Sequence, residues 1–225
     1  MIRIGGLALE GAGSDRVVRE GEGFARFIDV SVLLQNPGDA AALQAVLDAA
    51  GLAARGDAAG LVPVGIRPGR RMAARLLSLR RETHHCGGSA AVGARFRAEG
   101  LAEEAEEESR ADAVIIARGQ AMALNSSGTA PVPLRVVFTA AGRVSRPGFG
   151  GGLRAAVFNG VVETGSTLVL DGVAGRAALD GADVTAQIQG VWPLVAAGAD
   201  VIQFNDDIDG SHAGAASFYW RDAWW

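Results

Sequence analysis

Residues 125–139 read NSSGTAPVPLRVVFT, and this stretch sets the character of the second half of the chain. Gly128 and the prolines at 131 and 133 exclude a helix in its first part, because proline lacks a backbone N–H and glycine favours turns. Residues 134–139 are rich in β-branched and aromatic side chains, which is typical of a strand. The stretch therefore predicts a turn-rich opening segment that leads into a β-strand.

Short strands and tight turns continue from there to the C-terminus. Asp-Gly pairs at 171–172 and 180–181 are typical of hairpin turns, and residues 201–204 form a short apolar strand. The closing run alternates between two sides, which predicts one buried face. One side holds Ala216, Phe218, Trp220 and Trp224, and the other holds Ser217, Tyr219, Arg221 and Trp225. About six short strands separated by turns predict an antiparallel β-sandwich.

Composition narrows the class of protein. The 225 residues allow one or two domains with a sizeable core. A net charge of −4 argues against a protein that coats nucleic acid. No apolar run approaches the roughly 20 residues that a membrane helix needs, and the N-terminus lacks the layout of a signal peptide. We therefore expect synthesis in the cytoplasm, no nucleic-acid partner and no membrane partner. The single cysteine, Cys86, excludes an intrachain disulfide.

The first half of the chain mixes strands with one helix. Residues 2–10 are expected to form a first strand, and residues 11–23 a charged connection punctuated by glycine. In the next strand, Ile28, Val30, Val32 and Leu34 alternate with Asp29, Ser31, Leu33 and Gln35. Apolar residues at helical spacing then predict a helix over 39–50, with Gly51 as its C-cap.

Strands return after the helix, and the domain boundary follows them. Strands are expected at 61–66, 72–81 and 91–98, with the last two paired, and the acidic run 103–108 is interpreted as a solvated face or loop. We expect an N-terminal α+β domain over residues 1–110 and a C-terminal β-sandwich over residues 111–225. The predicted fold class is thus mainly β: a β-sheet domain with one helix, followed by the sandwich.

Two short stretches of the sequence contain side chains that can bind metal ions. His84-His85-Cys86 holds soft ligands, but adjacent side chains on a strand point to opposite faces, and the remaining histidine, His212, is distant in sequence. Residues 205–210, NDDIDG, match the opening of a calcium loop, but the position for its bidentate glutamate is Ala216. A hairpin tip and a surface turn are the better interpretations. We predict no metal-binding and no cofactor-binding residues.

No catalytic pattern is present in the sequence. A nucleophile elbow of the G-x-S-x-G type does not occur. The glycine-rich run 148–152 is not followed by a lysine or a helix start, so it is interpreted as a mobile connection between strands rather than a phosphate loop. Of the four tryptophans, Trp192 and Trp225 are interpreted as surface or interface contacts. We predict that the protein is not an enzyme and has no catalytic residues.

The order of these features resembles the phage distal tail protein family, the tail-tip hub subunits of long-tailed phages. The motifs that carry the resemblance are the opening segment 125–133, the strand 168–171, the turn 179–181, the stretch from Trp192 to Gly198, the strand 201–204, and the final strand with Arg221 and Trp224. The alternating strand, helix and paired strands of the first half fit as well. The chain departs from the family where Ala199-Asp200 follows Gly198 in place of asparagine, and in the short link between the domains.

The resemblance implies a fold and a role. It implies an N-terminal β-sheet domain with one helix and a C-terminal galectin-like sandwich. It also implies a structural, non-enzymatic virion protein that forms a six-fold ring between the tail tube protein and the tail-tip hub protein. The alternative from another class is a carbohydrate-binding β-sandwich module with exposed tryptophan.

The N-terminal domain is expected to carry most of the ring contact, because its sheet leaves strand edges to pair. The arginines of this region would either blunt those edges or meet the acidic run 103–108 of the adjacent subunit. They are Arg67, Arg70, Arg71, Arg75, Arg80 and Arg81.

Overall fold

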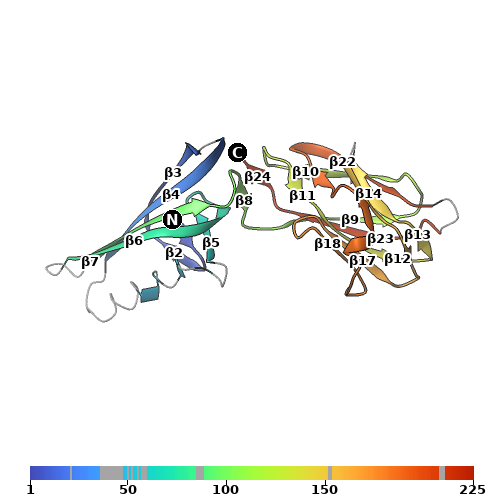
Figure 1. The fold of residues 1–225 in the computed structure, drawn as a ribbon, viewed down its shortest axis with the longest axis horizontal. Coiled ribbons are helices and arrows are strands. Elements are labelled where there is room, and N and C mark those ends of the chain that lie inside the picture. Colours follow the sequence, from blue (N-terminus) through green and yellow to red (C-terminus); the bar gives the residue numbers. More distant parts are fainter. Residues whose placement is uncertain are drawn as a thin grey trace. The chain divides into compact units, whose positions relative to one another are not determined.

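The chain forms two compact units (Figure 1). Both are mainly β and antiparallel, and the mainly β class is the one that the sequence predicted. Unit 1 comprises residues 1–106 together with Trp225, and unit 2 comprises residues 107–224. The computed structural model describes residues 1–20, 22–35, 48–49, 51, 53–54, 56, 60–84, 89–151, 154–207 and 211–225.

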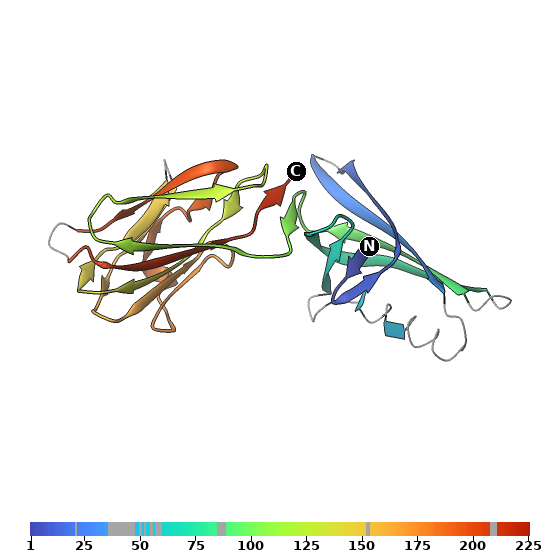
Figure 2. The same ribbon diagram turned by 180° about the vertical axis from the view of Figure 1, so that it is seen from behind.

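Unit 1 is built on one sheet with the strand order β2-β1-β5-β6-β7-β4-β3, and a short strand, β8, pairs with the start of β6. The strands β4, β6 and β7 run side by side through its length (Figure 2). In chain order the strands are β1 (Ile2–Ile4), β2 (Leu7–Leu9), β3 (Gly11–Glu20), β4 (Gly23–Gln35), β5 (Leu61–Gly65), β6 (Arg70–His84), β7 (Ser89–Ala98) and β8 (Glu103–Ala105).

One face of this sheet is covered by a hydrophobic core. Ile28, Val30 and Val32 are buried there, whereas Ser31 between them is exposed, which confirms the predicted alternation. Phe96 on β7 and Val64 on β5 pack into the same cluster. The pairing of β6 with β7 is also confirmed.

The N-terminal 23 residues differ from the prediction. Residues 2–10 form a hairpin of two strands rather than one strand, because Gly5 adopts a left-handed φ of 60° and turns the chain. The expected connection over 11–23 is the ten-residue strand β3, paired with β4 along its length. Nearly all of its side chains are exposed, so no apolar alternation marked it as a strand.

The predicted helix over 39–50 lies almost entirely outside the described residues. Asp48 and Ala49, near its end, are helical, so a single N-terminal helix is not confirmed. Within the described part of the chain, no helix is long and apolar enough to span a membrane.

Unit 2 has two main antiparallel sheets, with strand orders β10-β22-β14-β15-β20 and β19-β18-β17-β12-β23-β9. Its strands are β9 (Ser109–Ile115), β10 (Ala121–Ser126), β11 (Val132–Pro133), β12 (Arg135–Ala140), β13 (Val144–Ser145), β14 (Gly148–Gly151), β15 (Arg154–Phe158), β16 (Val161–Val162), β17 (Thr167–Asp171), β18 (Arg176–Leu179), β19 (Ala182–Asp183), β20 (Ile188–Gly190), β21 (Leu194–Val195), β22 (Gly198–Asn205), β23 (Gly214–Trp220) and β24 (Ala223–Trp224), with a 3-10 turn, η1 (Thr185–Gln187).

Four phenylalanines join the two sheets. Phe149 and Phe204 come from the first sheet, and Phe138 and Phe218 come from the second. The ring centroids of Phe149 lie 5.6, 5.3 and 6.0 Å from those of Phe138, Phe204 and Phe218, and all four side chains are fully buried. The two sheets therefore pack face to face over an aromatic core.

The closing alternation is largely confirmed, and so is the predicted tight turn at 180–181; Asp171 instead ends β17 and pairs with Arg176, so the other Asp-Gly pair opens a longer loop. Asp180 and Gly181 have φ angles of 48° and 84°, which is the type I′ hairpin turn expected of an Asp-Gly pair. Phe218 and Trp220 are buried on one side of β23, with Tyr219 half-buried on the other. Trp224 belongs to the separate strand β24 rather than to the same alternating run.

Residues 148–151 of the glycine-rich run form a strand rather than a connection between strands, so that interpretation was wrong; residue 152 lies outside the described residues. Residues 148–151 form β14, which lies between β22 and β15 in its sheet. A Cβ atom on Gly150 would lie 2.1 Å from the Arg154 carbonyl oxygen, and one on Gly151 would lie 2.5 Å from that of Val201. The glycines are present because the neighbouring backbones approach closely.

Candidate functional site

The structure assembles few groups that are typical of catalysis or metal binding. Among the described residues, no three or more His, Cys, Asp or Glu side chains cluster as a metal site would require. Residues 85–88 of the histidine–cysteine segment and 208–210 of the calcium-like segment lie outside the described residues.

The structure does bring together one pair that the sequence did not indicate. The Asp206 carboxylate is buried, and both of its oxygens lie within 2.8 Å of His212 Nδ1. Oδ1 of the adjacent Asp207 lies 3.6 Å from Arg146 Nη1. Asp206 and Asp207 of the calcium-like segment are thus both paired with basic side chains of the same chain.

The most elaborate polar arrangement is a charge cluster at one end of the unit 1 sheet. Arg26 on β4 is buried, and its guanidinium contacts Asp15 on β3 and Glu103 on β8. Arg67, in the turn before β6, contacts the same two carboxylates. Arg70 Nη1 lies 3.6 Å from Glu103 Oε2. Two carboxylates and two guanidiniums therefore alternate in a closed ring, which we call the charge ring.

The charges in this ring support one another. Partial burial works against the charge on Arg67, but the carboxylates of Glu103 and Asp15 outweigh it and raise the pKa of this guanidinium above its usual value. Arg26 Nη1 also donates to the Leu101 carbonyl oxygen at 2.6 Å. Each of the three guanidinium nitrogens of the buried Arg26 thereby donates at least one hydrogen bond.

The interpretation of the acidic run as a solvated face was wrong for Glu103. Its side chain is 4% exposed and is held by arginines of its own chain, so those arginines do not require an adjacent subunit as their partner. Glu106 similarly pairs with Arg3 at 2.6 Å. Glu104 and Glu107 are exposed, as predicted.

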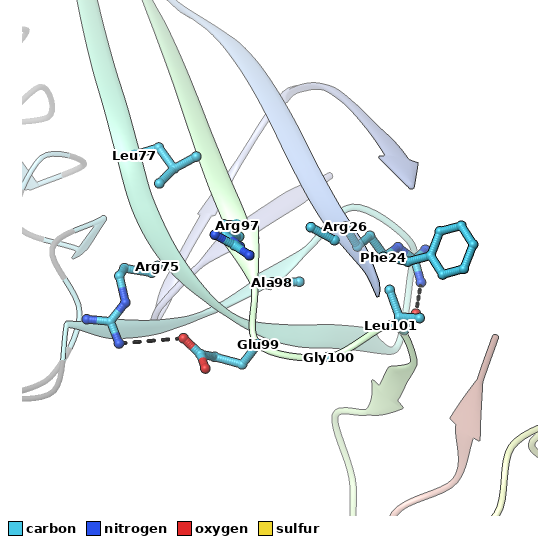
Figure 3. Close-up of a pocket in the computed structure, with 10 residues that line it drawn as sticks. Phe24, Arg26, Arg75, Leu77, Arg97, Ala98, Glu99, Gly100 and Leu101 are labelled. Carbon is cyan, nitrogen blue, oxygen red and sulfur yellow. Dashed lines mark hydrogen bonds and ion pairs between the residues drawn. The ribbon is translucent and has the colours of Figure 1, made fainter. Parts of the chain in front are cut away.

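A hollow of about 430 Å³ lies beside the charge ring (Figure 3). Phe24, Leu77 and Leu101 give it apolar walls, and Arg75 and Arg97 give it a polar rim. Arg75 is turned toward Glu99, with its Nη2 atom 3.5 Å from Glu99 Oε1. Arg97 Nη2 lies 2.8 Å from Glu20 Oε2. Because both rim arginines are paired with carboxylates, the hollow does not present an unbalanced charge to a ligand.

In unit 2, a second buried carboxylate holds the opening segment. Asp222 accepts hydrogen bonds from Ser127 Oγ at 2.5 Å and from Trp220 Nε1 at 3.0 Å. The backbone N–H groups of Thr129 and Ala130 donate to the Ala223 carbonyl oxygen. These contacts hold residues 127–130 of the opening segment against residues 220–223 near the C-terminus.

These contacts predict a dependence of stability on pH. Burial disfavours the charged form of Asp222, but hydrogen bonds from Ser127, Ser126 and Trp220 outweigh it and lower the pKa of this carboxyl. The ionised group therefore stabilises unit 2 above the ordinary aspartate pKa of about 3.9, and this contribution is lost as the pH falls through the lower pKa of the folded state.

We expect the wild type to lose stability below about pH 4 more steeply than Asp222→Asn, as measured by urea denaturation at a series of pH values. Asp180 and Asp183, whose carboxyl pKa values are also lowered by hydrogen bonds, are present in both proteins and so cancel in the comparison. Parallel pH curves for the two proteins would contradict the role of Asp222.

The four tryptophans divide between core and surface. Trp220 is buried, Trp192 and Trp224 are half-buried, and Trp225 is 70% exposed. Trp220 and Trp224 were both expected in the core: the expectation is confirmed for Trp220, whereas Trp224 is only half-buried.

Comparison with known proteins identifies a shared fold. No family model and no curated protein matches the chain. Among solved structures it is similar to the SPP1 Dit (gp 19.1) protein, described as a paradigm of the hub adsorption apparatus in phages that infect Gram-positive bacteria. The TM-score is 0.64 and the identity 13%, over 98% of this chain and 91% of that chain.

A chain of the phage p2 baseplate, in its activated conformation with Sr, is similar with a TM-score of 0.41 and 8% identity, over 98% of this chain and 88% of that chain; this score is too low to support an inference. The likeness to Dit confirms, at the level of fold, the resemblance to phage distal tail proteins.

Proposed function

We propose that this chain is a structural protein of a phage or prophage tail tip: a distal tail subunit whose ring joins the tail tube to the tip. The observation that carries the proposal is the likeness to SPP1 Dit, which extends over 98% of the chain and so covers both units. In this proposal, the protein is made in the host cytoplasm and resides in the virion. Its partners are further copies of itself, the tail tube protein and the tail-tip hub protein, and it has no enzymatic activity.

The domain roles follow the same proposal. Residues 1–110 form the ring, and residues 111–225 form a galectin-like sandwich. The face-to-face packing of the two sheets in unit 2 supports the second assignment.

Strand edges in unit 1 support ring formation. In the described part of the chain, β3 pairs with β4 and with no other strand. The pairing of β6 with β5 stops at Arg75, and the second half of β6 has β7 as its strand neighbour. Among the described residues, β3 is therefore the outer strand on one side of the run β6-β7-β4-β3, and no described strand pairs with the other side of the second half of β6.

Two different edges on opposite sides of one sheet suit a cyclic assembly. If β3 of one copy pairs with the second half of β6 in the next, the contact is heterologous and repeats around a closed ring. The number of copies, six, comes from the family resemblance. Backbone pairing of this kind depends little on side-chain identity, which is consistent with a shared fold at 13% identity.

The test is the assembly state of the purified full-length chain. We expect light scattering to show a species of about six copies of the 23.0 kDa chain as concentration rises, and negative-stain images to show rings. A strict monomer at high concentration, with no rings in the images, would contradict the proposal. Saturable glycan binding by that monomer would favour the carbohydrate-binding alternative.

A further inference from the structure

Residues 99–106 are the last part of unit 1 before the chain continues into unit 2, and we call them the connecting segment; they are fastened to the rest of unit 1 along their length. The Glu99 N–H donates to the Ala73 carbonyl oxygen, and the Glu106 N–H donates to that of Gly69, both at 2.9 Å. Between these points, β8 pairs with the first two residues of β6. These backbone contacts lie at the surface, and each alone contributes little to holding the segment.

The charge ring supplies a stronger attachment in the middle of this segment. Glu103 is the one member that the connecting segment contributes; Asp15, Arg26 and Arg67 come from β3, β4 and the turn before β6. The side chains of Glu103 and Arg26 are 4% and 6% exposed. If Glu103 left the ring, Arg26 would remain buried with Asp15 as its carboxylate partner, and Arg67 would lose one of its two. Removing one partner of a buried ion pair is strongly unfavourable.

We propose that Glu103 is a clamp: it anchors the connecting segment to unit 1 and so fixes the point from which the chain continues into unit 2. The neighbouring glutamates do not serve this role. Glu104 and Glu107 are exposed, and Glu106 pairs with Arg3, whose side chain is 55% exposed, at the surface. One of several similar glutamates is thus selected by its position among buried arginines. The inference rests on unit 1 alone and does not depend on the proposed ring.

Proteolysis can measure how readily the connecting segment opens, because a glutamate-specific protease can cleave at Glu99, Glu103, Glu104 and Glu106. We expect the full-length protein to resist cleavage there. In Glu103→Gln, which keeps the shape and removes the charge, the remaining sites should be cut about tenfold faster or more, because cleavage follows the population of the open segment. Arg67→Ala should also speed cleavage, because it removes the cation that contacts both Glu103 and Asp15. Arg67 is 45% exposed, so this second variant removes less buried structure than a change at Glu103.

The matched control is Arg143→Ala, which breaks an exposed ion pair with Glu163 in unit 2 and should leave the cleavage rate unchanged. Amide hydrogen exchange distinguishes a clamp from a general stabiliser. A clamp predicts faster exchange over 101–106, with β4 and β7 as protected as in the wild type. Wild-type cleavage rates in both variants, or exchange that rises equally through β4 and β7, would overturn the proposal.

Discussion

Replacing Phe149 with alanine is expected to reduce the free energy of unfolding of unit 2 by about 3–5 kcal/mol. The side chain is fully buried, and its ring contacts those of Phe138, Phe204 and Phe218. These partners come from both sheets, so the cavity would open between the layers. Collapse around it is restricted, because Gly148 and Gly150 on either side already lie in close contact with the neighbouring strand β15.

The measurement is urea denaturation followed by tryptophan fluorescence, which reports mainly on unit 2 because three of the four tryptophans, Trp192, Trp220 and Trp224, lie in it and only Trp225 is assigned to unit 1. The matched control is Ile116→Ala, also in unit 2, where the side chain is 75% exposed and the expected change is within about 0.5 kcal/mol. Unfolding of Phe149→Ala at the wild-type urea concentration would show that the two sheets are not held together by this aromatic core.

The sequence predicted β4 and β23, each of which has one buried and one exposed face, but it missed β10, whose last two residues were assigned to the turn-rich opening segment. In β4 and β23 the alternation of apolar and polar residues follows directly from that environment, so it can be read without a structure. The strand β3 was missed because it lies at an edge, where nearly every side chain is exposed and no alternation is required. β14 was missed because its glycines were interpreted as a sign of mobility. The glycines are required instead because the neighbouring backbones approach closely, and those neighbours can be identified only from the fold.

The charge ring could not be predicted for a related reason. Glu103 has the same sequence environment as its neighbours in an acidic run, and a solvated face is the usual meaning of such a run. Its partners Arg26 and Arg67 are 77 and 36 residues away in sequence. Burial of one particular glutamate is decided by the register of β8 against β6, which has no signal in composition or spacing. The resemblance to tail proteins came from the order of the motifs and from no single residue.

The edge of β3 offers the sharpest test of how a ring would form. Val17 and Val18 are 54% and 38% exposed, so replacing their side chains should disturb the core little. Successive N–H groups on a strand point to opposite edges, so one of these two residues directs its N–H toward β4 and the other directs it outward. Proline removes the N–H and adds a ring at that position. Val17→Pro and Val18→Pro are therefore a matched pair that differ in which edge they alter.

We expect one variant of the pair to unfold at a lower temperature, because it loses a bond to β4, and the other to keep the wild-type unfolding temperature. The thermally unchanged variant should assemble at least about 100-fold more weakly than the wild type, because the blocked contact recurs at every interface of a cyclic assembly. Light scattering and negative-stain images of both variants measure this directly. If the thermally unchanged variant forms rings as the wild type does, β3 is not the contacting edge, and the ring is held by another surface of the chain. These two variants test only whether β3 is the contacting edge. Whether the protein forms a ring at all is tested separately, by the assembly state of the unmodified chain.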